Sequence, residues 1–127
     1  MSKICFWVAG VLGMLLVLAH VFLGGAAVVP AWLGTPELPE KAAWLAYFSW
    51  HVGTVAMGLC ALAYMYAAIK PGQKGLAIFV NLMLTGFAAV GLTMALRGSD
   101  VLWTTPAPYA FWIITGFGWA GVFTAKA

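Results

Sequence analysis

Hydrophobic positions in this chain fall into four long runs, separated by short stretches rich in proline, glycine and charge. The runs cover residues 4–29, 42–69, 75–96 and 109–125. A helix that crosses a bilayer core of about 30 Å needs about 20 apolar residues, and the last run lies at the short end of that range. The pattern predicts an all-α fold, an integral membrane four-helix bundle that forms a single membrane domain over residues 1–127.

Prolines and charges define the boundaries between the runs. Pro30 is expected to end the first helix, and the sequence "PAWLGTPELPEK" that starts there predicts a loop. The second run stops at "KPGQK", which indicates a tight polar turn at Pro71 and Gly72. The third stops at "RGSD", and Pro106 and Pro108 precede the fourth. The first run is too long for the apolar core of a signal peptide, so it is expected to remain as a helix.

The composition supports a membrane environment and excludes one class of partner. Hydrophobic residues make up 65% of the chain and charged residues 7%, whereas soluble domains have about 45–50% and about 25%. A soluble domain of this length has too little interior to bury so much apolar surface. The net charge of +3 is scattered singly along the chain, which argues against nucleic-acid binding.

The basic residues predict the orientation. If the four helices alternate in direction, Lys3, Lys70, Lys74 and Lys126 lie on one side, and Lys41 and Arg97 lie on the other with all three acidic residues. Cytoplasmic loops carry the excess of Lys and Arg, so both termini are expected in the cytoplasm. Aromatic residues are expected at both membrane interfaces, with Tyr64 and Trp119 near the inner one.

Two histidines, His20 and His51, are the candidate site residues. His20 precedes Pro30 by ten residues and His51 follows Ala42 by nine, which places them about 15 Å and about 13.5 Å below the outer ends of their helices. The depths match, and consecutive helices are expected to be neighbours. The two imidazoles are therefore predicted to share one polar centre if both face the interior.

Three roles remain open for this pair. The histidines could hydrogen-bond to each other, to Thr115 or to a carbonyl, since an imidazole inside a membrane needs partners. They could instead ligate the iron of a b-type haem, with nearby glycines making room for the ring and with Arg97 and Lys41 meeting its propionates. A metal such as copper normally needs more ligands than two histidines, and no carboxylate lies inside a predicted helix.

Other polar and small residues suggest helix contacts. Asn81 and Thr85 lie four apart and are expected to form interhelical hydrogen bonds. Small residues recur at helical spacing in two rows, Gly116, Ala120 and Thr124 in one and Gly91 and Ala95 in the other, and each row could contact this chain, a partner or lipid. Cys5 and Cys60 follow no metal-ligand spacing and are expected as buried thiols.

The function expected from these features is that of an accessory or assembly subunit of a larger membrane complex, or of a homo-oligomer. The chain has no phosphate loop, nucleophile elbow or Cys/His dyad, so an enzyme of hydrolytic type is not expected. The alternative is an electron-transfer protein that binds haem through His20 and His51. The expected partners are the lipid bilayer and other membrane subunits, and the expected location is the bacterial cytoplasmic (inner) membrane.

Overall fold

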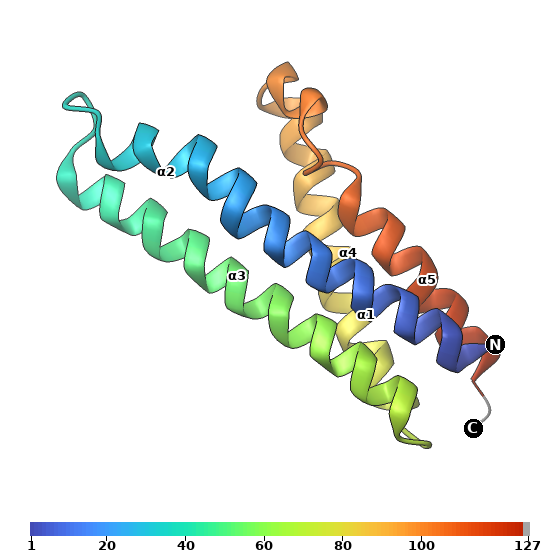
Figure 1. Ribbon diagram of the computed structural model, residues 1–127. Helices are drawn as coiled ribbons and strands as arrows, with labels where there is room; N and C mark the ends of the chain where they lie inside the picture. The colour runs from blue at the N-terminus through green and yellow to red at the C-terminus, as the bar shows by residue number, and fades with distance from the viewer. Residues whose placement is uncertain (126–127) are drawn as a thin grey trace.

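The computed structural model describes residues 1–125, and all of its long secondary-structure elements are helices (Figure 1). The first helical segment consists of α1 (Ser2–Ala19), a short π-helix η1 (His20–Gly24) and α2 (Gly25–Leu33), which follow one another without a break. It is followed by α3 (Glu40–Ile69) and α4 (Lys74–Arg97). A 3₁₀ turn η2 (Asp100–Thr104) then leads to α5 (Ala110–Thr124). The prediction of an all-α chain with four helical segments is confirmed for this part of the chain.

Three of these segments have the length and apolarity needed to cross a membrane. They are Ser2–Leu33, Glu40–Ile69 and Lys74–Arg97. The fourth, α5, is apolar but shorter, and its 15 residues span about 22 Å at 1.5 Å per residue. The four expected ranges differ from the observed helices by only a few residues at each end, with one exception.

The exception is the end of the first helix, where the prediction that Pro30 terminates it is wrong. The helix continues through Pro30 to Leu33, and Gly34 closes it by donating its N–H to the Pro30 carbonyl. Proline removes its own N–H from the helix ladder and its ring crowds the carbonyl four residues earlier, but a helix can continue through it when neighbouring groups and local adjustments satisfy the freed carbonyl. The connection to α3 is correspondingly shorter than expected.

Helix α1 packs against α3 on one side and against α5 on the other, and α4 likewise contacts both α3 and α5. Its glycines allow this close packing: a Cβ at Gly10 would lie 2.7 Å from Cγ of Met65, and one at Gly13 would lie 3.1 Å from Cβ of Ala61. On the other side, the ring of Phe6 lies against Gly121 of α5. The core continues between α3, α4 and α5 through Leu84, Val80, Ile114 and Val122.

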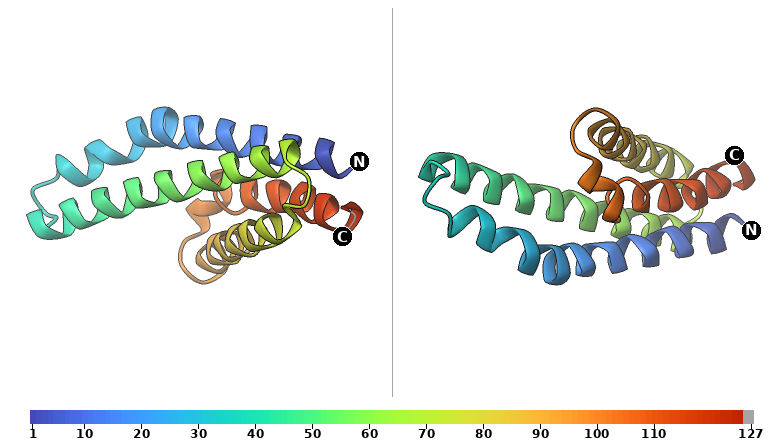
Figure 2. Two further views of the ribbon diagram at one scale, coloured as in Figure 1. Left: turned by 90° about the horizontal axis from the view of Figure 1, so that it is seen from below. Right: turned by 90° about the horizontal axis from the view of Figure 1, so that it is seen from above.

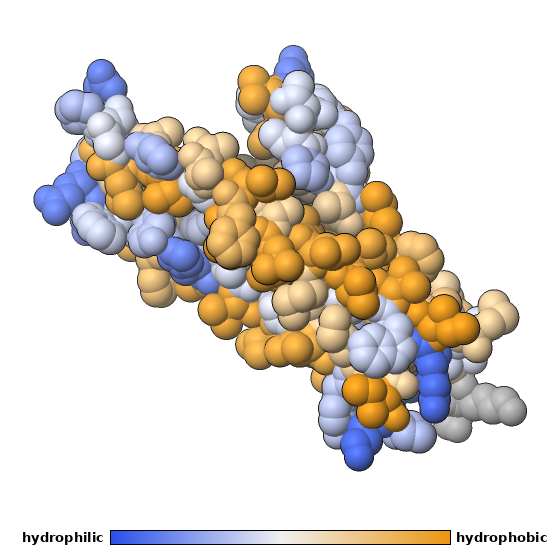
Figure 3. All heavy atoms as spheres, viewed as in Figure 1, coloured by the Kyte–Doolittle hydropathy of each residue, from blue (hydrophilic) through white to orange (hydrophobic). Residues whose placement is uncertain are grey.

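The four helical segments converge at one end of the bundle, called the closed end, and splay apart at the other, called the open end (Figure 1). All four segments meet where the N-terminus lies beside the end of α5 (Figure 1). Toward the opposite end, α2 and the first half of α3 form an arm that projects beyond α4 and α5 in both views of Figure 2. The space-filling view shows a notch between this arm and the η2 region (Figure 3). We call the closed end the inner end and the open end the outer end.

Candidate functional site

His20 lies at the start of the π-helix and stacks on Trp50 of α3. The ring centroids are 3.7 Å apart and the planes are inclined by 16°. Gly24 makes this contact possible, because a Cβ there would lie 3.0 Å from the Trp50 ring. The indole thus fills the space beside Gly24 that the sequence suggested for a macrocycle. A π turn inside an α-helix frequently marks a functional site, and here it begins at the candidate histidine.

Trp50 belongs to a small aromatic cluster within the arm. Trp32 of α2 packs edge-on against it at 5.5 Å between centroids. The backbone carbonyl of Trp50 accepts a hydrogen bond from the Thr54 hydroxyl at 3.0 Å. Trp50 of α3 therefore contacts both η1 and α2, and these contacts help to hold the arm together.

The Nε2 atom of His20 is buried and has no hydrogen-bond partner among the described residues. A buried polar atom without a partner costs about 1–3 kcal/mol. A haem iron at this nitrogen would require displacement of the atoms that bury it. The unpartnered Nε2 is the feature of the site that most needs an explanation.

His51 has different surroundings from His20. It is exposed, and its ring packs edge-on against Tyr47, one helical turn earlier, at 4.5 Å between centroids. It makes no hydrogen bond to any described residue. Consecutive helical residues point about 100° apart, so His51 leaves α3 in a direction well away from that of Trp50. The structure places the two histidines on neighbouring helices and gives each a separate aromatic neighbour.

The other residues proposed around a haem are distributed over the molecule. Arg97 ends α4 and is exposed, on the other side of the notch from the arm. Lys41 is exposed in the first turn of α3. Thr115, which was expected as a hydrogen-bond partner of the histidines, is buried on α5 and donates its hydroxyl to the Trp112 carbonyl of its own helix.

A second polar centre lies buried near the inner end, where α3, α4 and α5 meet. Asn81 contacts the Tyr64 hydroxyl, and its other amide atom lies 2.8 Å from Nε1 of Trp119 and 3.2 Å from its backbone N. Indole and backbone N–H groups only donate, so the amide oxygen faces Trp119 and the amide nitrogen donates to Tyr64. In this arrangement each side-chain nitrogen and oxygen of the trio has a hydrogen-bond partner.

The expected interhelical bond of Asn81 is therefore present, whereas Thr85 donates only to the Asn81 carbonyl in its own helix. Tyr64 and Trp119 were expected at the inner interface, but Tyr64 is fully buried and both contact Asn81. Tyr64, Asn81 and Trp119 lie at similar distances along their helices from Lys70, Lys74 and Ala125, respectively. The comparison of depths that paired His20 with His51 would therefore also have grouped these three residues from the sequence.

The structure offers no ready metal centre. Within residues 1–125 there is no group of three or more His, Cys, Asp or Glu side chains placed to hold an ion. Cys60 is buried and Cys5 is half-buried, and both are free thiols.

Comparison with protein-family models, with curated proteins and with solved structures finds no match for this chain. The function is therefore argued from the geometry above.

Proposed function

We propose that this chain is an integral membrane protein with its inner end in the cytoplasm. Support comes from the three long apolar helices and from the distribution of charge. Lys3, Lys70 and Lys74 lie at the inner end, whereas the outer end carries Lys41, Arg97, Glu37, Glu40 and Asp100. Basic residues favour the cytoplasmic side. Lys126, also assigned to that side, lies outside the described residues. A bacterial cytoplasmic membrane is the location proposed.

Within that membrane the chain acts as a subunit of a larger assembly, either with other membrane proteins or with copies of itself. The observation that carries this proposal is that one row of small residues faces away from the rest of the chain. Gly116, Ala120 and Thr124 are all exposed on α5, and a Cβ at Gly116 would have no neighbour within 4 Å. Lipid does not require a flat helix surface, but a second helix that approaches closely does.

The flanks of this row have the matching shape. Ile113, Phe117 and Phe123 are exposed beside it, so the face has a shallow centre with bulky borders. The other row is used within the chain, because Ala95 is buried and a Cβ at Gly91 would lie 2.9 Å from the Ala107 carbonyl. Exposed His51 adds support, since a polar ring that faces lipid is unfavourable unless a partner covers it.

Substitution of the row tests the proposal. Gly116→Leu and Ala120→Leu are expected to release the partner or dissociate the oligomer, measured as mass and composition after purification in a mild detergent. Gly86→Leu on α4 is the control, because Gly86 is exposed and also has no neighbour within 4 Å but lies outside the row. A wild-type protein that purifies as a monomer without any bound protein would refute the proposal.

A second candidate function is haem-dependent electron transfer, and the unpartnered Nε2 of His20 favours it. An imidazole nitrogen at iron needs no other partner, and two axial histidines suffice for a b-type haem. In that role His20 and His51 would supply the ligands and Trp50 would have to move from its place beside Gly24. Absorption spectra of the oxidised and reduced protein test it: a Soret band that disappears in both His20→Ala and His51→Ala supports haem, and colourless wild-type protein excludes it.

A further inference from the structure

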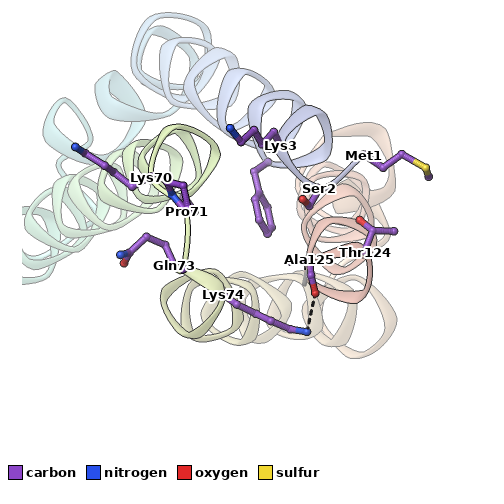
Figure 4. Close-up of a pocket in the computed structure, with 12 residues that line it drawn as sticks. Met1, Ser2, Lys3, Lys70, Pro71, Gln73, Lys74, Thr124 and Ala125 are labelled. Carbon is purple, nitrogen blue, oxygen red and sulfur yellow. Dashed lines mark hydrogen bonds between the residues drawn. The ribbon is translucent and has the colours of Figure 1, made fainter. Parts of the chain in front are cut away.

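A cavity of about 420 Å³ opens at the inner end of the bundle. It lies between the start of α1, the α3–α4 turn and the end of α5, as the close-up in Figure 4 shows. Its rim carries Ser2, Lys3, Gln73 and Lys74, whose side chains can all donate hydrogen bonds. The rim therefore carries hydrogen-bond donors from the start of α1 and from the start of α4, which are far apart in the sequence.

The charge around this cavity is unbalanced. Lys3, Lys70 and Lys74 line it, and the three acidic residues of the chain, Glu37, Glu40 and Asp100, all belong to the outer end. Lys74 donates to the Ala125 carbonyl at 3.1 Å, which orders its side chain across the opening but leaves its charge unneutralised (Figure 4). The amine of Lys70 and the side-chain amide of Gln73 both point away from the centre in the same view. Among residues 1–125, the cavity thus has a positive field and no carboxylate beside it.

Two helix starts reinforce this field. Helices α1 and α4 both begin at the cavity, and neither has a side-chain hydrogen bond at its N-cap. The first N–H groups of each helix are consequently free, and the positive end of each helix dipole lies at the cavity. Free N–H groups of this kind favour phosphate oxygens.

The inner wall of the cavity is apolar. Phe6 and Ala67 line it, and the adjoining outer surface of α1 exposes Ile4 and Trp7. A ligand with a charged phosphate and an attached hydrocarbon chain would match both parts, with the phosphate at the rim and the chain along α1. Basic pockets between helices at the cytoplasmic side are typical sites for anionic lipid headgroups.

We propose that this cavity binds the phosphate headgroup of an anionic lipid from the cytoplasmic leaflet. The proposal rests on the membrane location proposed above. Lys3 and Lys74 supply the charge, Ser2 donates a hydrogen bond, and the first turns of α1 and α4 offer N–H groups to the phosphate oxygens. A free phosphate ion has the same headgroup chemistry but lacks the hydrocarbon chain that would contact Ile4 and Trp7.

Binding of short-chain lipids to the full-length protein in a neutral detergent tests the proposal. Phosphatidylglycerol is expected to bind and phosphatidylcholine to bind far more weakly, measured by native mass spectrometry. Lys3→Gln/Lys74→Gln is expected to weaken phosphatidylglycerol about 30-fold, the loss expected when two lysines at a lipid surface are removed. Lys3→Gln/Lys70→Gln retains the Lys74 bond to Ala125 and should also weaken binding. Lys41→Gln/Arg97→Gln removes the same charge from the outer end and should have no effect.

Three results would overturn the proposal. The first is equal binding of phosphatidylglycerol and phosphatidylcholine. The second is unchanged phosphatidylglycerol binding in both inner-end variants, provided that these variants elute and unfold like the wild type. The third is binding of inorganic phosphate without binding of phosphatidylglycerol. In a detergent micelle both ends of the protein are accessible to added lipid, so a wrong membrane orientation would not produce any of these results. Failure of the oligomer proposal would likewise leave the lipid measurement unchanged.

Discussion

The indole Nε1 of Trp119 on α5 lies 2.8 Å from the side-chain amide of Asn81 on α4. The same amide reaches the Tyr64 hydroxyl on α3, so one side chain ties three helices together at one depth. Hydrogen bonds of this kind fix the relative rotation of helices whose surfaces are otherwise uniformly apolar.

Replacement of Asn81 by Leu should therefore destabilise the bundle by about 0.5–2 kcal/mol, because the hydroxyl of Tyr64 and the indole of Trp119 lose their partner. Denaturation in mixed detergent micelles measures this loss. Thr85→Val is the control, since its hydroxyl bonds only within its own helix. A double-mutant cycle of Asn81→Leu with Tyr64→Phe should show coupling, and strict additivity of the two changes would contradict the network.

Gly118 should be intolerant of any side chain. A Cβ there would collide with both the Asn81 amide and the Tyr64 hydroxyl. Gly118→Ala is expected to cost about 1–3 kcal/mol of stability, as overpacking of a filled core does. The matched control is Gly86→Ala on α4, where a Cβ meets nothing within 4 Å. Equal stability of the two variants would show that the α4–α5 interface is looser than described.

The two histidines should react differently with diethyl pyrocarbonate, which attacks unprotonated imidazole nitrogens. His51 is exposed and should be modified rapidly, whereas the buried Nε2 and the Trp50 stack should protect His20. Variants that retain one histidine each, His20→Gln and His51→Gln, separate the two rates by mass spectrometry. Trp50→Ala should open His20 to the reagent, and rapid modification of His20 in the native protein would contradict its burial.

Single cysteines should report the orientation. In a Cys5→Ala/Cys60→Ala background, cysteine at Gln73 is expected to react with an impermeant thiol reagent only from the cytoplasmic side, since basic residues concentrate at that end. Cysteines at Glu37 and Ser99 should react only from the outer side. Glu37 is preferable to Gly34, where a Cβ would lie 2.8 Å from the Pro30 carbonyl. The reverse pattern at all three positions would invert the proposed topology.

The sequence alone determined the number of helices, their approximate ends and the polar positions within them, because those features depend on local hydropathy and on breakers. It misplaced the end of the first helix, since Pro30 removes one backbone donor without forcing the chain out of a helix. It could not anticipate the π turn at His20–Gly24, which rotates α2 relative to α1. No residue pattern in that stretch distinguishes an i+5 from an i+4 bond.

Only the tertiary structure decided which faces meet. In a soluble bundle the apolar stripe of each helix identifies its buried face, but α3 and α5 carry similar apolar residues on every face, which is the pattern expected of helices that contact lipid. The sequence could therefore place His20 and His51 at one depth but not assign their directions. That Trp50 covers His20, that Asn81 reaches Tyr64 and Trp119, and that Gly116 faces outward all depend on helix rotation, which side-chain packing between the helices fixes.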